Sequence, residues 1–423
     1  MSNKLNVCLL NDSFPPSIDG VATAVLNYAA IIQSKYGSAT VVTPKYPDFE
    51  DDYTYNVVRF PSLNFEKSLG YRAGMPFDSK VLHQLAEMDF DILHCHCPFA
   101  SAYVARALRE ATGLPLVFTY HTKFDYDIQR LIKSKPLQNT IIKFLLNNVQ
   151  ASDEVWVVSD GAGKNLRSLG YEGDYIIMEN GVDLPKEKVS RERTDKISEK
   201  HGIPAGVPVY LFVGRLVWYK GLKIILDGLA KAKENERDFR MIFVGGGDDA
   251  DEVKEYAHKI GLDEKCIFTG AISDRETLRD YYGRSDLFLF PSVFDTNGLA
   301  VREAAACGTA SVLIKDSCAG EGITDGRNGF LIEENSEALA DVIIKHGGDR
   351  ELLGRIGDHA MEDLYYSWDE SVAKAVERYA IVKDNFSKGI GSRVNLKMDK
   401  LFETVVDIMR QIDKVQGIDT LKK

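Results

Sequence analysis

Two successive series of short apolar runs, most of them followed by a longer helical pattern, constrain the fold of this chain more than any other feature. The first series comprises the runs at 6–10, 39–43, 91–94, 116–119, 154–158 and 175–178. The second comprises the runs at 209–213, 240–244, 266–269, 287–290, 310–313 and 329–332. Short apolar strands that alternate with helices of ten or more residues predict βαβ units and a parallel sheet with helices on both faces. We therefore expect an α/β chain with two doubly wound domains.

A charged stretch at 185–195 separates the two series. A chain of 423 residues suffices for two or three domains that each bury a core. We expect an N-terminal domain at 1–184, a C-terminal domain at 206–366 and a helical tail at 367–423. Ligands of such sheets bind beyond the carboxyl ends of the strands, so two of these edges facing each other would form a cleft.

Composition excludes several classes of protein. Hydrophobic residues make up 44% and charged residues 27% of the chain, as in a soluble globular protein. No apolar run approaches the length of a membrane span and the N-terminal run is too short for a signal peptide, so we expect a cytoplasmic protein. The formal net charge of −11 argues against nucleic acid as the main partner, because phosphate backbones favour a basic face. Six scattered cysteines give no disulfide framework, which fits a reducing compartment.

The segment His94-Cys-His-Cys97 combines side chains that bind zinc. On a strand, alternation points His94 and His96 to one face and Cys95 and Cys97 to the other. Four adjacent residues then cannot converge on a tetrahedral ion without a distorted backbone. We interpret the segment as the end of a buried strand and expect no metal site there.

The segment from Asp295 to Glu303 follows an apolar run and places two carboxylates eight positions apart. Gly298, between them, is the expected start of a helix, whose unpaired N–H groups and dipole favour a phosphate. Asp295 in the preceding loop and Glu303 about one turn into the helix are placed to accept hydrogen bonds from sugar hydroxyls. The pattern predicts a nucleotide-sugar site, although helix capping alone also favours an acidic first turn.

A second motif, Gly214-Arg-Leu-Val-Trp-Tyr-Lys-Gly221, follows a strand and opens a helix. Arg215 leaves the edge of the strand, and Lys220 lies at or near the first helical turn. The helix dipole repels a cation there unless an anion is also present, so the two cations indicate a diphosphate, with a solvated basic turn as the alternative. Charge-assisted hydrogen bonds of this kind contribute about 1.5–3 kcal/mol each.

The loop Gly245-Gly-Gly-Asp-Asp249 also follows a strand. It lacks the full Gly-x-Gly-x-x-Gly spacing of a dinucleotide-binding loop, so it gives a dehydrogenase little support. A specific ligand contact and a plain tight turn remain equally compatible with this pattern.

Taken together, the motifs resemble the retaining family-4 glycosyltransferases of the GT-B fold. The resemblance rests on Gly-Arg-Leu-x₄-Lys-Gly at 214–221, on Asn180-Gly-Val-Asp183, and on Pro291-Ser followed by acid-x₇-Glu. Pro15-Pro-x₃-Gly20-Val-Ala and Thr119-Tyr-His-Thr122 match as well, and the motifs occur in the order typical of the family. The implied fold is GT-B, with two Rossmann-like domains facing across a cleft. The segment at 120–126 further resembles members that glycosylate diacylglycerol.

The resemblance implies a role for each matching residue of the C-terminal half. Arg215 and Lys220 would hold the diphosphate of the donor and stabilise it as it departs. Glu303 would accept hydrogen bonds from the ribose hydroxyls. Gly298 and Leu299 would present backbone N–H groups to the phosphate and the sugar.

Further residues complete the implied site. Ile272 would recognise the base through its backbone, and Gly20 would let the first loop approach donor and acceptor closely. His121 would contact the donor sugar, and Asp295, where the family usually has Glu, would bind hydroxyls of that sugar. Asp295 is one methylene shorter than Glu, and Asn297 replaces a common aromatic residue. Both departures leave the sugar open, but not the type of reaction.

The resemblance implies transfer of a hexose, with glucose from a UDP-linked donor as the first expectation, onto a hydroxyl with retention of anomeric configuration. Protein cations would replace a metal, and we expect no cofactor besides the nucleotide sugar as co-substrate. The expected acceptor is a diacylglycerol or glycolipid, with a soluble thiol precursor, a polysaccharide or a protein as alternatives. An epimerase or phosphorylase and a non-catalytic sugar-nucleotide sensor are the rival classes.

Two segments bear on larger partners. Residues 123–150 combine cations with apolar side chains, as in helices that dock to an anionic membrane or that merely cover a sheet. Docking would make the protein peripheral on the inner face of the cell membrane. The tail has an apolar stripe at three- and four-residue steps, which predicts packing on the same chain, with homodimerisation as the alternative. The stripe consists of Met398, Leu401, Phe402, Val405, Ile408, Met409 and Ile412.

Overall fold

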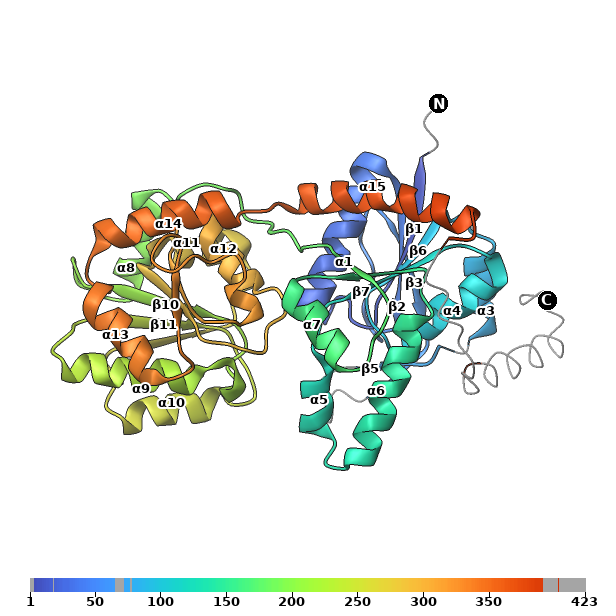
Figure 1. Ribbon diagram of the computed structural model, residues 1–423. Helices are drawn as coiled ribbons and strands as arrows, with labels where there is room; N and C mark the ends of the chain where they lie inside the picture. The colour runs from blue at the N-terminus through green and yellow to red at the C-terminus, as the bar shows by residue number, and fades with distance from the viewer. Residues whose placement is uncertain (1–3, 18, 65–71, 77, 391–401, 403–423) are drawn as a thin grey trace. The chain divides into compact units, whose positions relative to one another are not determined.

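The computed structural model describes residues 4–17, 19–64, 72–76, 78–390 and 402. The chain divides into two compact units, the first of residues 1–180 with 368–423 and the second of residues 181–367. Each unit is built on its own parallel sheet with helices on both faces (Figure 1). The predicted fold class, two Rossmann-like parallel-sheet domains with a helical C-terminal region, is confirmed.

Within the described residues, the main sheet of the first unit has seven parallel strands in the order β3-β2-β1-β6-β7-β8-β9. They are β1 (Leu5–Leu10), β2 (Gly37–Pro44), β3 (Asn56–Phe60), β6 (Ile92–Cys95), β7 (Leu116–Tyr120), β8 (Glu154–Val157) and β9 (Tyr175–Ile177). The chain runs outward from β1 to β3 and then outward in the other direction from β6 to β9. The neighbours β1 and β6 therefore form the topological switch point, the position at which such sheets bind ligands.

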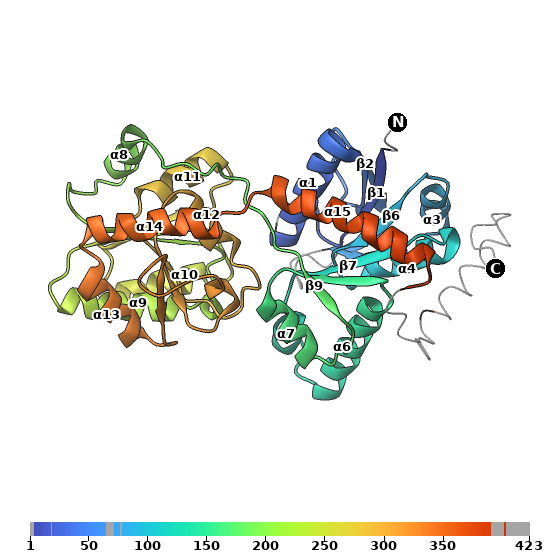
Figure 2. The same ribbon diagram turned by 45° about the horizontal axis from the view of Figure 1, so that its top comes forward.

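Helices on the two faces of this sheet enclose separate apolar cores. One core contains Leu10, Leu93 and Phe118 of the sheet under one set of helices. These are α3 (Ser79–Ala86), α4 (Ala100–Thr112), α5 (Phe124–Leu131), α6 (Lys135–Gln150) and α7 (Asp160–Ser168). The other core contains Leu9 and Trp156 of the sheet under α1 (Gly20–Ile31) and α15 (Trp368–Ser387). Helix α15 thus returns to the first unit after the second unit is complete, and it lies beside α1 in both views (Figures 1 and 2).

The sheet of the second unit has, within the described residues, six parallel strands in the order β12-β11-β10-β13-β14-β15. They are β10 (Val209–Val213), β11 (Arg240–Val244), β12 (Cys266–Gly270), β13 (Leu287–Phe290), β14 (Ser311–Ile314) and β15 (Phe330–Ile332). The order again reverses between neighbours, here β10 and β13. This second switch point therefore lies between the strands that precede the two charged motifs.

The helices of the second unit form two layers around its core (Figures 1 and 2). One layer consists of α9 (Leu222–Glu234), α10 (Ala250–Lys259) and α13 (Ser336–His346). The other consists of α8 (Arg191–Lys200), α11 (Arg275–Arg284), α12 (Leu299–Ala306) and α14 (Arg350–Leu364).

Each apolar run of the sequence corresponds to a strand, but three further features were missed. The edge strand β3 and the hairpin of β4 (Ser62–Asn64) and β5 (Arg72–Gly74) lack the apolar pattern of the central strands. The stretch at 185–195, interpreted as a connection, includes the first half of α8. This helix buries one residue, Ile197, and is held by charge, because Arg193 pairs with Glu276 and Asp280 of α11.

Of the predicted apolar stripe in the tail, Phe402 lies within the described residues. Its ring is buried in the core of the first unit, 5.9 Å from the ring of Tyr103, and the Arg106 guanidinium stands 3.8 Å from its centroid. The stripe residues outside the described part of the chain are Met398, Leu401, Val405, Ile408, Met409 and Ile412. Within the part of the chain that the structure describes, no helix combines the length and hydrophobicity needed to cross a bilayer.

Candidate functional site

The basic loop after β10 lies against the loop after β13 because a glycine permits close contact. Gly221 adopts a left-handed φ of 77°, and a Cβ there would lie 2.1 Å from the carbonyl oxygen of Pro291. Any other residue would push the loops apart. The turn Trp218–Lys220 ends immediately before this glycine, so Lys220 is held beside the segment that carries Asp295.

Lys220 and Asp295 form an ion pair in this position. The Lys220 Nζ lies 2.5 Å from Asp295 Oδ1, and the Ser292 hydroxyl donates to Asp295 Oδ2 at 2.6 Å. The two charged side chains are only 15% and 19% exposed, so water screens the pair little. Lys220, which is predicted to bind the diphosphate, therefore pairs here with Asp295, which is predicted to bind the sugar.

Arg215 reaches the same pair of loops through an aromatic residue. Its guanidinium NH2 donates to the Tyr219 hydroxyl at 2.8 Å, and the Tyr219 ring lies 4.8 Å from the ring of Phe294, next to Asp295. This hydrogen bond is exposed, which leaves the guanidinium accessible to a ligand.

Helix α12 begins as the sequence predicts. Gly298 precedes it with a left-handed φ of 61°, and a Cβ there would approach Ala319 to 3.0 Å. Leu299 is the first helical residue, and Asn297 in front of the glycine is buried. Because glycine has no side chain that could cap the helix, the first N–H groups of α12 form a natural anion-binding end.

Glu303 lies in the second turn of α12, where two side chains of α11 hold its carboxylate. The Arg275 NH2 donates to Oε1 at 2.5 Å, and the Tyr282 hydroxyl donates to Oε2 at 2.7 Å. Burial lowers the pKa of Arg275, but Glu303 and Asp183 outweigh that effect and raise the pKa above its usual range. Burial and the neighbouring Glu303 raise the pKa of Tyr282 as well, so its hydroxyl stays a donor.

Sequence reasoning missed the roles of Arg275 and Tyr282 around Glu303. Arg275 is the first residue of α11, where a helix dipole disfavours a cation. The argument applied to Lys220 would therefore have identified it. The hydroxyl of Tyr282 gives no comparable signal, because an aromatic residue in that position also fits an ordinary core.

The glycine-rich loop after β11 serves to pack loops together. Gly246 accepts from the Leu216 N–H at 2.8 Å, and Asp249 donates its N–H to Leu216 at 3.2 Å. A Cβ at Gly245 would lie 1.9 Å from the carbonyl oxygen of Gly214. The loop thus supports the base of the basic motif, which favours the tight-turn interpretation. Ile272, beyond β12, is half-buried against the core of the second unit.

In the first unit, His121 follows β7 and lies next to a histidine that follows β6. His121 Nε2 is 2.9 Å from His96 Nδ1, and burial lowers the pKa of His121 to about 3. His94 contacts the Tyr379 hydroxyl of α15 at 2.6 Å and the Thr119 hydroxyl at 2.7 Å. His121 is therefore a neutral hydrogen-bonding group.

The predicted division of the segment 94–97 between two faces is confirmed. The rings of His94 and His96 lie 3.9 Å apart on the face covered by α1 and α15. Cys95 lies in the opposite core and contacts Ser101 and the carbonyl of Cys97. Gly20, the other predicted site residue of this unit, opens α1 behind its capping residue Asp19, whose carboxylate accepts from two N–H groups of the first turn.

The predicted residues thus gather into two groups, one in each unit. In the second unit Arg215 and Lys220 follow β10, while Asp295, Asn297, Gly298, Leu299 and Glu303 follow β13, its neighbour at the switch point. Ile272 follows β12, two strands away from β10. Gly20 and His121 follow β1 and β7 of the first unit, on either side of β6.

Comparison with known proteins identifies the family of this chain. Residues 18–186 match the family Glycosyltransferase Family 4, and residues 193–363 match Glycosyl transferases group 1. Alpha-monoglucosyldiacylglycerol synthase of Streptococcus pneumoniae is 22% identical, over 96% of this chain and 93% of its own length. The GDP-mannose-dependent alpha-mannosyltransferase of Corynebacterium glutamicum is 26% identical, over 89% of each chain.

The fold is shared with solved structures. The Anabaena protein HepE in complex with UDP and glucose superposes with a TM-score of 0.71 at 21% identity, covering 89% of this chain and 99% of that chain. Likeness at this level of identity shows the fold. With both halves matched in order and the fold in common, the chain belongs to the family-4 glycosyltransferases of the GT-B fold.

Proposed function

We propose that this glycosyltransferase transfers a hexose from a UDP-linked donor to a hydroxyl of a diacylglycerol or glycolipid, with retention of anomeric configuration. Glucose is the first candidate for the hexose. The observation that carries the proposal is the meeting of Lys220 with Asp295 at the switch point of the second unit, directly ahead of the uncapped start of α12. Support for the sugar and the lipid comes from the name of the Streptococcus pneumoniae relative, and for UDP from the ligands of HepE.

In the proposed donor complex, the diphosphate lies between the cations of the basic loop and the first N–H groups of α12. Arg215 and Lys220 would bind it, together with the backbone of Gly298 and Leu299. Asp295 would exchange its bond with Lys220 for hydrogen bonds with sugar hydroxyls. A phosphate can replace the carboxylate at Lys220 because it carries more charge and more acceptor oxygens.

The remaining predicted residues would bind the outer parts of the donor. Glu303 would accept from the ribose, and the backbone of Ile272 would contact the base. Asn297 would lie beside the sugar. His121 would donate or accept a hydrogen bond as a neutral imidazole, and Gly20 would allow close approach of its loop.

The proposed reaction breaks the bond between the anomeric carbon and the diphosphate oxygen and forms a bond from that carbon to the acceptor oxygen. The acceptor proton passes to the departing diphosphate on the same face of the sugar, which gives UDP and a retained glycoside. Arg215, Lys220 and the N-terminus of α12 would stabilise the negative charge that develops on the leaving group. We propose that these protein charges take the place of a metal ion and that no cofactor takes part.

A second donor, GDP-mannose, is favoured by the name of the Corynebacterium glutamicum relative. Purified protein would therefore be incubated with UDP-glucose, UDP-galactose or GDP-mannose and diacylglycerol in mixed micelles. Of the three donors, we expect only UDP-glucose to give both UDP release and an α-glucoside, whose configuration NMR identifies. Product with inverted configuration would contradict retention, and product only from GDP-mannose would replace the proposed sugar.

The proposed lipid acceptor is supported by the helical tip of the first unit, formed by α5, α6 and their connection. Leu131 and Leu137 are about half exposed at this tip, and Lys133 and Lys135 are exposed between them. Exposed apolar side chains flanked by cations fit an anionic bilayer surface, where each cation contributes about 1 kcal/mol.

Co-sedimentation with vesicles tests this part of the proposal. We expect binding to phosphatidylglycerol-containing vesicles, weaker binding to neutral vesicles, and loss of binding in Lys133→Glu/Lys135→Glu. The matched control is Lys254→Glu/Lys259→Glu on α10, another exposed pair on a helix. Equal partitioning of both double variants would contradict docking through the tip, and transfer to a soluble acceptor alone would contradict the lipid acceptor.

A further inference from the structure

One guanidinium joins two carboxylates that are far apart in the sequence. The NH2 of Arg275 donates both to Glu303 and to Asp183 of the segment that leads into the second unit. Arg275 opens α11, where the dipole disfavours a cation, so the two acids account for its position. Each of the two NH2 hydrogens can donate to one of these carboxylates, so a single guanidinium links both segments.

The Glu303 carboxylate is thereby oriented by one donor on each oxygen. Arg275 occupies one acceptor position of Oε1, and Tyr282 occupies one of Oε2. A carboxylate has about four acceptor positions, so one remains on each oxygen. Two neighbouring oxygens with one acceptor position each suit two neighbouring hydroxyl groups, such as the 2′- and 3′-hydroxyls of a ribose.

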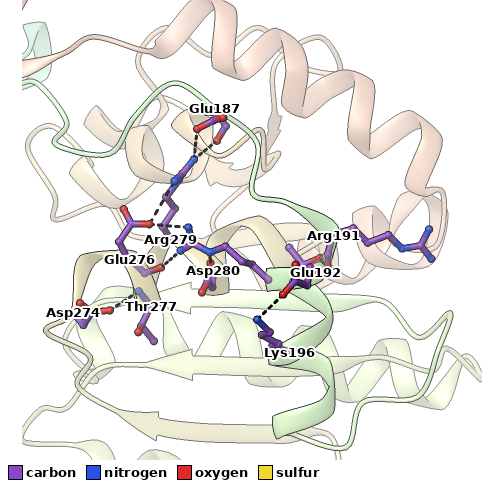
Figure 3. Close-up of polar contacts among 11 residues, drawn as sticks. Glu187, Arg191, Glu192, Lys196, Asp274, Glu276, Thr277, Arg279 and Asp280 are labelled. Carbon is purple, nitrogen blue, oxygen red and sulfur yellow. Dashed lines mark hydrogen bonds and ion pairs between the residues drawn. The ribbon is translucent and has the colours of Figure 1, made fainter.

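The helix that carries Arg275 is itself held in place. One turn further along α11, Arg279 pairs with Glu187 at 3.0 Å and lies close to Glu276 (Figure 3). Arg193 of α8 pairs with Glu276 at 2.8 Å. Glu187 also donates its N–H to the Ala306 carbonyl at the end of α12. The position of Arg275 relative to α12 is thus fixed by several contacts.

We propose that Arg275 is a positioning residue for the donor: together with Tyr282 it orients the Glu303 carboxylate so that both ribose hydroxyls bind at once. This inference rests on the proposed function. It predicts that Arg275 acts on the ribose through Glu303 and leaves the diphosphate contacts untouched.

The test compares UDP with 2′,3′-dideoxy-UDP by isothermal titration. We expect wild-type protein to bind UDP at least tenfold more tightly than the dideoxy analogue. In Arg275→Met, UDP affinity should fall about tenfold while affinity for the analogue stays the same. In steady-state assays the donor KM should rise with little change in kcat, because the leaving-group contacts remain.

Arg327→Met is the matched control, since it removes an arginine–carboxylate pair from the same unit without touching α11 or Glu303. It should keep the wild-type preference for UDP over the analogue. Tyr282→Phe, a milder change, should reduce that preference in the same way as Arg275→Met. In a Glu303→Gln background, Arg275→Met should cause no further loss.

Equal weakening of both nucleotides by Arg275→Met, or an unchanged preference in Arg275→Met and Tyr282→Phe, would overturn this inference while leaving the proposed function intact. Failure of wild-type protein to bind UDP would overturn the proposed function, and this inference with it.

Discussion

Gly221 combines a left-handed backbone with a contact that no side chain can share. Its φ of 77° alone favours glycine, and the carbonyl of Pro291 occupies the space of a Cβ. Gly270 has a similar φ of 75° but nothing within 4 Å of its Cβ position. Comparing substitutions at the two positions therefore separates the effect of backbone strain from the effect of close contact.

We expect Gly270→Ala to lower the free energy of unfolding by about 1 kcal/mol, from the strained backbone alone. Gly221→Ala should cost roughly 2 kcal/mol more, because overpacking forces the loops apart. It should also abolish transfer by displacing Lys220 from Asp295. Urea denaturation monitored by tryptophan fluorescence measures the free energy of unfolding of both variants. An equal loss in Gly270→Ala and Gly221→Ala would show that the contact with Pro291 is not tight.

Variants of the Lys220–Asp295 pair should affect stability and catalysis differently. Lys220→Met leaves a mostly buried carboxylate without its cation and should destabilise the protein by roughly 1–3 kcal/mol. Adding Asp295→Asn removes that charge and should restore part of the loss, a coupling of about 1 kcal/mol or more. Transfer should stay abolished in both variants, since neither holds the diphosphate. Restored activity in the double variant would remove the proposed role of Lys220.

The charged residues of the two motifs could be singled out from sequence because each motif lies next to an apolar strand and a glycine. Their mutual contacts could not, since the Lys220–Asp295 pair joins positions 75 residues apart in the chain. The contacts of Arg275 could not be predicted for the same reason, although its place at the start of a helix could have singled it out. Its partners Asp183 and Glu303 come from segments that only the folded sheet brings together.

At the scale of elements, the ends of β6 and β7 carry histidines that the fold keeps neutral. Burial is the largest cause that lowers the pKa of His94, His96 and His121. For His121 the folded pKa is about 3, against an ordinary value of 6.5. Between these values the unfolded chain binds a proton that the folded chain does not.

The contribution of these histidines to the free energy of unfolding should therefore be fully present above about pH 6.5 and should decrease as the pH falls below that value. His121 alone should contribute about 1.4 kcal/mol per pH unit to this fall. Urea unfolding at pH 7.5, 6 and 5 measures the slope, and His121→Gln, which cannot titrate, is the comparison. A slope that is identical in the variant would show that His121 becomes protonated in the folded protein.

Central strands were predictable because they are apolar throughout, whereas peripheral elements were not. β3 at the edge includes Arg59, which pairs with Asp51, and α8 is held to α11 by ion pairs. Ion pairs between distant segments leave no periodic signal in the sequence. The hydrophobic pattern thus determines the two sheets, but not the charged elements that border them.

At the scale of the whole molecule, the chain passes between the two units twice. The Val182 N–H donates to the Tyr366 carbonyl, and Val182 pairs with Ser367, so the two crossing segments lie side by side. Beyond this point α15 packs on the first sheet, where Trp368 and Tyr379 are buried. Arg378 of α15 makes a bidentate bond to Glu154 of β8.

We expect residues 181–367 to fold as an isolated fragment, because the core of the second unit comes from this range alone. Residues 1–180 should not fold stably, since removal of α15 exposes large side chains worth roughly 1.5–3 kcal/mol each. Joining residues 368–390 to residue 180 through a Gly/Ser linker should restore cooperative unfolding, measured by circular dichroism. A stable fragment of residues 1–180 would show that α15 is dispensable.

The position of α15 has a consequence during synthesis. A ribosome must translate all of residues 181–367 before the helix that completes the first unit emerges, a delay of roughly 10–40 s at about 5–20 residues per second. Throughout that interval the part of the apolar core that α15 covers stays exposed in the nascent N-terminal half. Chaperone binding to stalled ribosomes should therefore persist until translation passes Ser387 and cease soon afterwards.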